Sequence, residues 1–180
     1  MEYELIEKEK IKLIGLNYHG SIAENGVAFE EMVEDLWRRL SEFCINRWES
    51  IEDEVINPEH SYEVQVWNEE ELEKSGQMNV FVGFEFADLE RIPVQLVAKV
   101  LPGGKYLAFT LEGEEIRAWE EYLLREWFPG SDYWLRSFDE QLFHVQCFHE
   151  NKFKGIDNLE ESELKVLVPV EEIDQEIMED

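Results

Sequence analysis

The segment Tyr62-Glu63-Val64-Gln65-Val66-Trp67 returns about half a chain later as Phe143-His144-Val145-Gln146-Cys147-Phe148. Aromatic residues begin and end both segments, and Val-Gln stands at the centre of each. A repeat over such a separation predicts one supersecondary unit used twice, with each copy burying the apolar face of the other. The seam between two such copies is a natural place for a small-molecule cleft.

Each half of the chain shows the same order of predicted elements, namely a strand, a helix and two strands. Apolar residues at i, i+3, i+4 and i+7 predict the helices, and short apolar runs between turn residues predict the strands. We expect helices at 29–44 and 114–127, a loop around Asn25-Gly26, and strands at 13–18, 62–67, 80–86, 94–100, 106–111, 143–148 and 164–170.

These elements predict a single α+β domain over residues 1–170, because neither half could cover both faces of its own sheet. The domain would consist of two pseudo-symmetric βαββ repeats, at about 3–88 and 92–170. The acidic residues 171–180 would form a tail that is frayed or folds into a short helix.

Charge is the most unusual property of the composition. The chain has 43 acidic and 16 basic residues, a net charge of −27, while 44% of its residues are hydrophobic. Such a protein folds into a globule, repels nucleic acid and anionic lipid, and attracts cations. A solvated surface, a cationic ligand and a basic protein partner all agree with this charge. Without a signal peptide or a membrane-spanning run, we expect a cytoplasmic protein.

Alternation along the strands sorts the side chains into two faces. We expect Tyr62, Val64 and Val82 to pack under the helices, which leaves their neighbours on the opposite face. That face would be a mostly apolar wall with a few polar groups, as a drug-like pocket requires. Its expected members are Gln65, Trp67, Phe81, Glu85, His144, Gln146 and Phe148, with Tyr106 and Tyr133 at the mouth.

Three of these residues have specific expected roles. Trp67 and Phe148 would hold an aromatic ligand or face its cation, each contact being worth about 0.5–2 kcal/mol. Glu85 would pair with a ligand cation, or act as a general base if burial raised its pKa. The plainer alternatives are core aromatics and a solvated strand carboxylate. The four histidines lack metal-ligand spacing, and no phosphate-binding loop occurs, so we expect neither metal nor cofactor.

Several segments together resemble the GyrI-like small-molecule-binding domain, which is the effector-binding domain of BmrR-type and AraC-type regulators and of stand-alone proteins. The resemblance covers roughly Tyr3 to Val170 and lies in the order and spacing of Phe81-Val82-Gly83-Phe84-Glu85-Phe86, Ile92-Pro93, Leu101-Pro102-Gly103-Gly104-Lys105-Tyr106, Trp127-Phe128-Pro129 and Leu164–Val170.

The resemblance implies an antiparallel sheet with helices on one face and a pocket between the two units for hydrophobic, often cationic, aromatic molecules. Members of this family often carry an acidic residue two positions before an aromatic in the penultimate strand. Here Gln146 precedes Phe148, so the carboxylate must come from elsewhere, and Glu85 is the candidate. No helix-turn-helix precedes Tyr3, so we expect no direct contact with nucleic acid.

The leading functional hypothesis is a stand-alone binding domain that senses or sequesters hydrophobic, cationic aromatic molecules. The resemblance also implies two alternatives. One is a hydrolase of strained electrophiles such as cyclopropane-bearing genotoxins, with Glu85 as its catalytic residue. The other is an acidic interaction module of the gyrase-inhibitor type, with a protein partner. The sequence leaves the ligand and the oligomeric state open.

Overall fold

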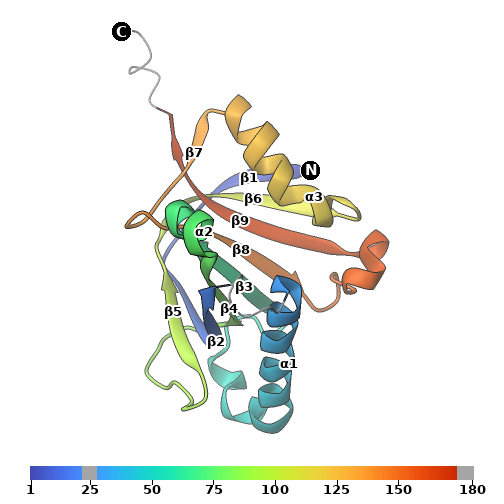
Figure 1. Cartoon of the computed structure of the whole chain (residues 1–180). Coiled ribbons are helices and arrows are strands. Elements are labelled where there is room, and N and C mark those ends of the chain that lie inside the picture. The colour runs from blue at the N-terminus through green and yellow to red at the C-terminus, as the bar shows by residue number, and fades with distance from the viewer. Residues whose placement is uncertain (22–27, 174–180) are drawn as a thin grey trace.

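The computed structural model describes residues 1–21 and 28–173. Within these residues, nine antiparallel strands form one sheet in the order β1-β6-β9-β8-β3-β4-β2-β5, with β7 paired to β9 (Figure 1). The strands are β1 (Glu2–Lys8), β2 (Ile11–Ser21), β3 (His60–Trp67), β4 (Gln77–Glu85), β5 (Val97–Leu101), β6 (Gly104–Glu112), β7 (Tyr133–Leu135), β8 (Leu142–His149) and β9 (Glu163–Glu172). The predicted α+β class and antiparallel sheet are confirmed.

Three α-helices occur in the described part of the chain: α1 (Phe29–Arg47), α2 (Glu69–Ser75) and α3 (Glu115–Tyr122). The chain continues from α3 through a π turn at Leu123–Trp127 and a 3-10 turn at Phe128–Gly130. Asn68 begins α2 by accepting a hydrogen bond from the backbone N–H of Glu71, at 3.0 Å. Further 3-10 turns lie at 48–50, 52–54 and 156–161.

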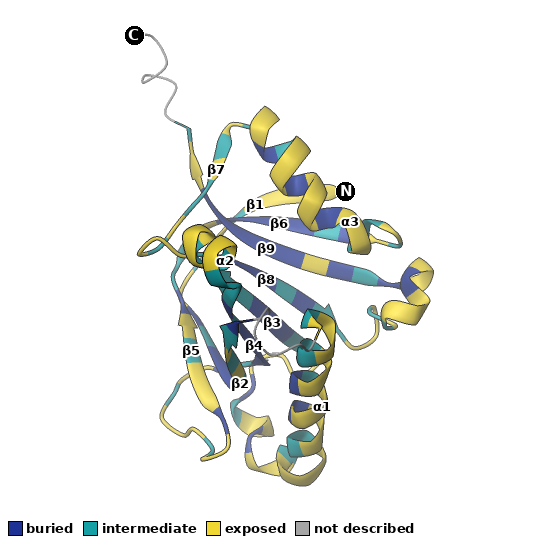
Figure 2. Cartoon of the chain, in the orientation of Figure 1, coloured by how far each residue is buried: buried dark blue, intermediate teal, exposed yellow. Residues whose placement is uncertain are grey.

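Helices α1 and α3 lie on the same face of the sheet, over its two halves (Figure 1). Leu36 and Leu40 of α1 are buried in one apolar cluster with Val80 of β4. Trp119 of α3 is buried in another with Val166 of β9. The inner sides of both helices are buried and their outer sides are exposed (Figure 2). Helices on one face of the sheet are therefore confirmed.

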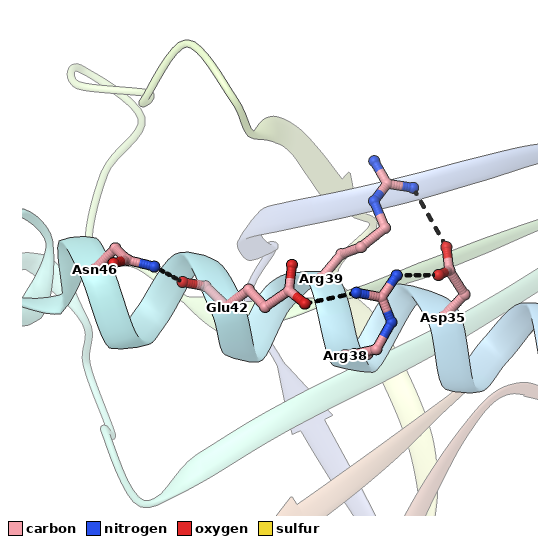
Figure 3. Close-up of polar contacts among 5 residues, drawn as sticks. All are labelled: Asp35, Arg38, Arg39, Glu42 and Asn46. Carbon is pink, nitrogen blue, oxygen red and sulfur yellow. Dashed lines mark hydrogen bonds and ion pairs between the residues drawn. The ribbon is translucent and has the colours of Figure 1, made fainter.

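The outer side of α1 carries charged side chains that pair along the helix (Figure 3). Arg38 contacts Asp35 and Glu42, each at 2.5 Å, and Arg39 lies 3.8 Å from Asp35. Asn46 donates a hydrogen bond to the carbonyl of Glu42 at 2.7 Å. Exposed pairs at this spacing contribute about 0.3–0.5 kcal/mol each. They support the helix locally and leave its other side free to cover the sheet.

The face of the sheet without helices is a packed core. Strands β1 and β2 lie near opposite ends of the strand order, yet only Glu9 and Lys10 connect them. The sheet must therefore curl until its two ends approach each other. Side chains from both halves meet in this interior, among them Tyr62, Phe81 and Tyr106, and all three are buried.

The two halves of the sheet meet at the β3–β8 pair. Val64 lies opposite Val145, and these are corresponding positions of the two similar segments. On one side of this pair the strands run β3-β4-β2, and on the other they run β8-β9-β6. In chain order each half contains a strand, a long helix and two strands (β2, α1, β3, β4 and β6, α3, β8, β9), with α2 added in the first half and β7 in the second. The arrangement is the one a duplication would produce, although the internal repeat itself stays a prediction, as do the domain limits drawn from it.

Several element bounds differ from the sequence prediction. The strand predicted at 13–18 is part of the longer β2, and β1 precedes it as a separate strand that pairs with β6. β7 lies outside the predicted strands, since three residues are too few to show a period of two. The predicted loop at Asn25-Gly26 and most of the predicted acidic tail lie outside the described residues.

Strands β2 and β4 approach closely at a pair of glycines. Gly15 lies opposite Gly83, and a Cβ at Gly15 would lie 1.9 Å from the carbonyl oxygen of Val82. That separation is far inside van der Waals contact, and the obstacle is backbone, which cannot rotate away. Only glycine fits this position without moving the two strands apart.

We therefore expect Gly15→Ala to destabilise the protein by about 1–3 kcal/mol, the usual cost of overpacking a core. Urea unfolding followed by tryptophan fluorescence measures this change. Gly130→Ala is the matched control, because no atom lies within 4 Å of the added methyl group. Equal stabilities of the two variants would contradict the close approach.

Candidate functional site

A cavity of about 460 Å³ opens between α1 and α3. Strands β3 and β8 form its floor, and the chain after β8 closes one end. Its lining is mostly apolar: Phe29, Val33, Trp37, Ile116, Phe148, Phe153, Ile156, Leu159 and Leu164, with Glu30, Glu34, Ser61, Glu63, Arg117 and Gln146 as the polar members. An apolar cavity of this size with a few polar groups suits a drug-sized molecule.

Glu63 is the buried polar group of the cavity floor, with only 4% of its surface exposed. The indole Nε1–H of Trp37 donates to its Oε2 at 2.9 Å. The amide Nε2 atoms of Gln65 and Gln146 donate to its Oε1 at 2.8 and 3.4 Å. These three donors come from α1, from β3 itself and from the neighbouring β8. Glu63 thus joins the helix to both central strands.

Burial raises the pKa of the Glu63 carboxyl above its ordinary value of 4.5, and the hydrogen bonds from Trp37 and Gln65 act in the opposite direction. Desolvation is the larger effect, because a buried carboxylate loses its hydration entirely. No basic side chain within the described residues forms an ion pair with Glu63. A cation that entered the cavity would restore the missing counter-charge.

The aromatic walls stand beside this carboxylate. Trp37 meets Phe148 edge to face, with ring centroids 5.4 Å apart, and Phe148 meets Phe153 in the same way at 4.9 Å. Such contacts fix the orientation of the rings, since edge-to-face pairs are favoured over random packing. Glu30 and Glu34 of α1 add negative charge at the rim, while Arg117 lies 3.6 Å from Glu114.

Five of the predicted site residues lie on the helix-covered face. Gln146 and Phe148 line the cavity directly. Gln65 and Trp67 line a neighbouring hollow. His144 is buried between the rings of Trp67 and Trp119, with centroids 5.6 and 4.8 Å away. Desolvation lowers the pKa of His144 to about 3, so this imidazole is neutral at physiological pH.

The structure does not bring Glu85, Phe81, Tyr106 or Tyr133 to this cavity. Glu85 accepts a hydrogen bond from the hydroxyl of Tyr62 at 2.9 Å, on the face without helices. Phe81 and Tyr106 are buried in the core of that face. Tyr133 stacks on Trp127, with ring centroids 6.3 Å apart.

The sequence-based assignment of faces was wrong for the central strands. It placed Tyr62 and Val82 on one face, but in the structure Val82 lies opposite Glu63, and Tyr62 lies opposite Gly83. Shifting the register of an antiparallel pair by one residue turns every side chain to the other face. The expectation of a cleft on the helix-free face, with Glu85 beside Trp67 and Phe148, is therefore corrected. The cavity lies under the helices.

Sequence reasoning missed Glu63 and Trp37. One signal was available for Glu63, because it alternates in step with Gln65 and Trp67, which were expected in the site. Trp37 sits at helical spacing with apolar neighbours, so it reads as ordinary core. The hydrogen bond from its indole crosses 26 residues of sequence, and nothing in the local pattern indicates it.

The family model for the GyrI-like small-molecule-binding domain matches residues 1–171. The chain belongs to this family. It is a small-molecule-binding domain of the GyrI-like type, as the resemblance noted from the sequence implies, and its match extends over both halves of the sheet. No curated protein matches the sequence.

Solved structures share this GyrI-like fold at low sequence identity. The structure of SAV2435 bound to tetraphenylphosphonium is 14% identical, with a TM-score of 0.66 and coverage of 95% of this chain and 94% of that one. The C-terminal domain of EcmrR is 14% identical, with a TM-score of 0.60 and coverage of 96% and 98%. A protein of Staphylococcus aureus MU50 is 15% identical, with a TM-score of 0.60 and coverage of 95% and 99%.

None of the helices in the described residues of this GyrI-like chain is long and apolar enough to cross a membrane.

Replacing Glu63 by Gln tests the energetic cost of the buried carboxylate. When folding raises the pKa of a carboxyl, the protein loses stability as the pH rises from the pKa of the unfolded state to that of the folded state. The Glu63→Gln variant has no such carboxyl. Its free energy of unfolding should therefore rise relative to that of the native protein between about pH 4 and about pH 8, by about 1.4 kcal/mol for each unit by which folding raises the pKa of Glu63. Urea unfolding at both pH values measures the gain.

Glu34→Gln serves as the control, because Glu34 is an exposed carboxylate at the cavity rim. This variant removes a carboxylate from the same cavity and leaves the buried one in place. If the stability of Glu63→Gln relative to the native protein were the same at both pH values, the hydrogen bonds would balance the effect of burial, and the raised pKa would be contradicted.

Proposed function

We propose that this protein binds lipophilic aromatic cations in the cavity between α1 and α3, with ionised Glu63 as the counter-charge. The observation that carries the proposal is a buried carboxylate on an apolar, aromatic floor, with no basic partner among residues 1–21 and 28–173. A buried charge is costly unless it is paired, and a ligand cation would supply the pair. The role would be sensing or sequestration of such molecules.

Two further facts support this ligand class. The net charge of −27 raises the local concentration of cations around the protein, and Glu30 and Glu34 continue that negative field to the rim of the cavity. SAV2435, which shares the fold, is bound to tetraphenylphosphonium in its structure, and that molecule is a lipophilic aromatic cation.

The position of Glu63 accounts for the neutral residue in β8. Glu63 lies directly opposite Gln146 in the β3–β8 pair. Members of the family often have their acidic residue at the position of Gln146, as the sequence comparison above implies. In this chain the carboxylate stands on the adjoining strand, and Gln146 donates a hydrogen bond to it at 3.4 Å. The negative charge would thus stay in the same part of the cavity floor.

A matched pair of ligands tests the role of charge. Methyltriphenylphosphonium and the neutral triphenylphosphine oxide have similar size and the same three rings. The cation should raise the melting temperature and quench tryptophan fluorescence, with stabilisation following RT ln(1 + [L]/Kd). Glu63→Gln should weaken cation binding by at least about tenfold and leave the neutral ligand nearly unaffected, because only the charged pair is lost.

Glu85→Gln is the control variant, since Glu85 lies on the other face and contacts Tyr62. It should bind the cation as the native protein does. If Glu63→Gln kept full affinity for the cation, or if Glu85→Gln lost it, Glu63 would not be the counter-charge.

Trp37→Phe separates the hydrogen bond from the aromatic wall. The variant keeps a ring beside Phe148 but removes the N–H donated to Glu63. Losing a donor to the ionised form raises the pKa of the carboxyl further. Cation affinity falls as the pH drops through the pKa of Glu63, because protonation removes the counter-charge. We therefore expect the midpoint of the pH profile of affinity to move to higher pH in Trp37→Phe.

Isothermal titration over a range of pH measures these midpoints. Trp119→Phe is the control, since the ring of Trp119 contacts His144 rather than Glu63. An unchanged midpoint in Trp37→Phe would show that the indole N–H does not stabilise the ionised carboxylate.

A further inference from the structure

A second hollow of about 340 Å³ lies beside the first. Both hollows are lined by Phe29, the first residue of α1. The second is also mostly apolar, and its lining includes Trp67, Leu72, Met78 and Leu124, together with Gln65 and Glu120. Like the first cavity, it has aromatic and aliphatic walls, and Glu120 is the one carboxylate in its lining.

The two hollows follow each other along the same two elements. On β3, Ser61 and Glu63 line the first hollow, and Gln65 and Trp67 line the second. The second pair stands four residues further along the strand, which corresponds to roughly 13 Å at the usual rise. On α3, Ile116 lines the first hollow and Glu120, one helical turn further, lines the second. The groove between β3 and α3 thus has two compartments in line.

Gln65 connects the two compartments. Its side chain lines the second hollow, and its amide donates to the Glu63 carboxylate in the first at 2.8 Å. A ligand group bound beside Gln65 in the second compartment is therefore close to a hydrogen-bond partner of the Glu63 carboxylate in the first. The ring of Trp67 lines the second compartment and also contacts the ring of His144, with ring centroids 5.6 Å apart.

Glu120 is the carboxylate of the second compartment. Among residues 1–21 and 28–173, its side chain makes neither a hydrogen bond nor an ion pair, whereas its neighbour Glu121 contacts Arg125 at 2.7 Å. Part of Glu120 is exposed to solvent, while the protein around its carboxyl desolvates it and raises its pKa. An unpaired carboxylate beside an indole ring suits a second cationic group.

We infer that the groove takes elongated dications, with one cationic ring against Glu63 and the other against Glu120 and Trp67. This inference rests on the proposed function of the first compartment and names the ligand class that the whole groove fits. Both ends of such a ligand bind to one chain, so the second contact forms at a high effective concentration. A dication of matching length therefore gains affinity that neither end has alone.

A bis-quinolinium with a decamethylene linker is a suitable probe, and its control is the monocationic half, with the same ring and a decyl chain. At about 0.15 M ionic strength, which screens the surface charge, the dication should bind one per chain and at least about tenfold more tightly than the half. An ethylene-linked dication should lose this advantage, because its linker cannot span the two compartments.

Glu120→Gln should remove the advantage of the long dication and leave the affinity of the monocation unchanged within about twofold. Glu121→Gln removes the same charge from the same helix outside the groove and should retain the advantage. Equal affinities of dication and half, or an equal loss in Glu121→Gln, would overturn the inference while binding of the monocation still upheld the proposed function. If the monocation also failed to bind, the proposed function itself would be overturned.

Discussion

The hydrogen bond from Trp37 to Glu63 holds the site together. It fixes helix α1 to the centre of the sheet, where β3 pairs with β8, at a length of 2.9 Å. Without that donor, the buried carboxylate would lose part of the stabilisation of its ionised form. The same contact places the Trp37 ring against Phe148 and so sets one wall of the cavity. The position of α1, the negative charge of the cavity floor and the shape of one cavity wall thus all depend on the contact between Trp37 and Glu63.

The cavity lies under the helices, whereas side chains fill the middle of the other face. Strands β1 and β2 are joined by two residues although they belong to opposite ends of the sheet, so the sheet curls and fills its inner face with side chains such as Phe81 and Tyr106. On the outer face, α1 and α3 each cover one half, and the floor between them stays partly uncovered. The first cavity thus lies between two apolar clusters, one under α1 and the other under α3.

The sequence predicts the kind of fold well, because long periodic segments carry its signal. The apolar spacing of α1 gives its start at Phe29, and the similar segments 62–67 and 143–148 are the two central strands. It does not predict which face each strand turns to the helices. The register between β3 and β4 decides this, and the apolar residues Tyr62 and Val64 suit either interior equally. The sites on β3 and β4 were therefore combined wrongly, and Glu85 of β4 was placed beside Trp67 of β3.

Measuring the pKa of the Glu63 carboxyl, in the free protein and with a cation bound, tests most directly whether this carboxylate is the counter-charge in the cavity. Carbon-13 NMR of the labelled carboxyl, assigned with Glu63→Gln, gives its pKa with and without tetraphenylphosphonium. We expect a pKa above the ordinary value of 4.5 in the free protein, and a clear fall when the cation binds, because an opposite charge favours the ionised form. An ordinary pKa in the free protein, or a pKa unchanged by a saturating amount of bound cation, would contradict it.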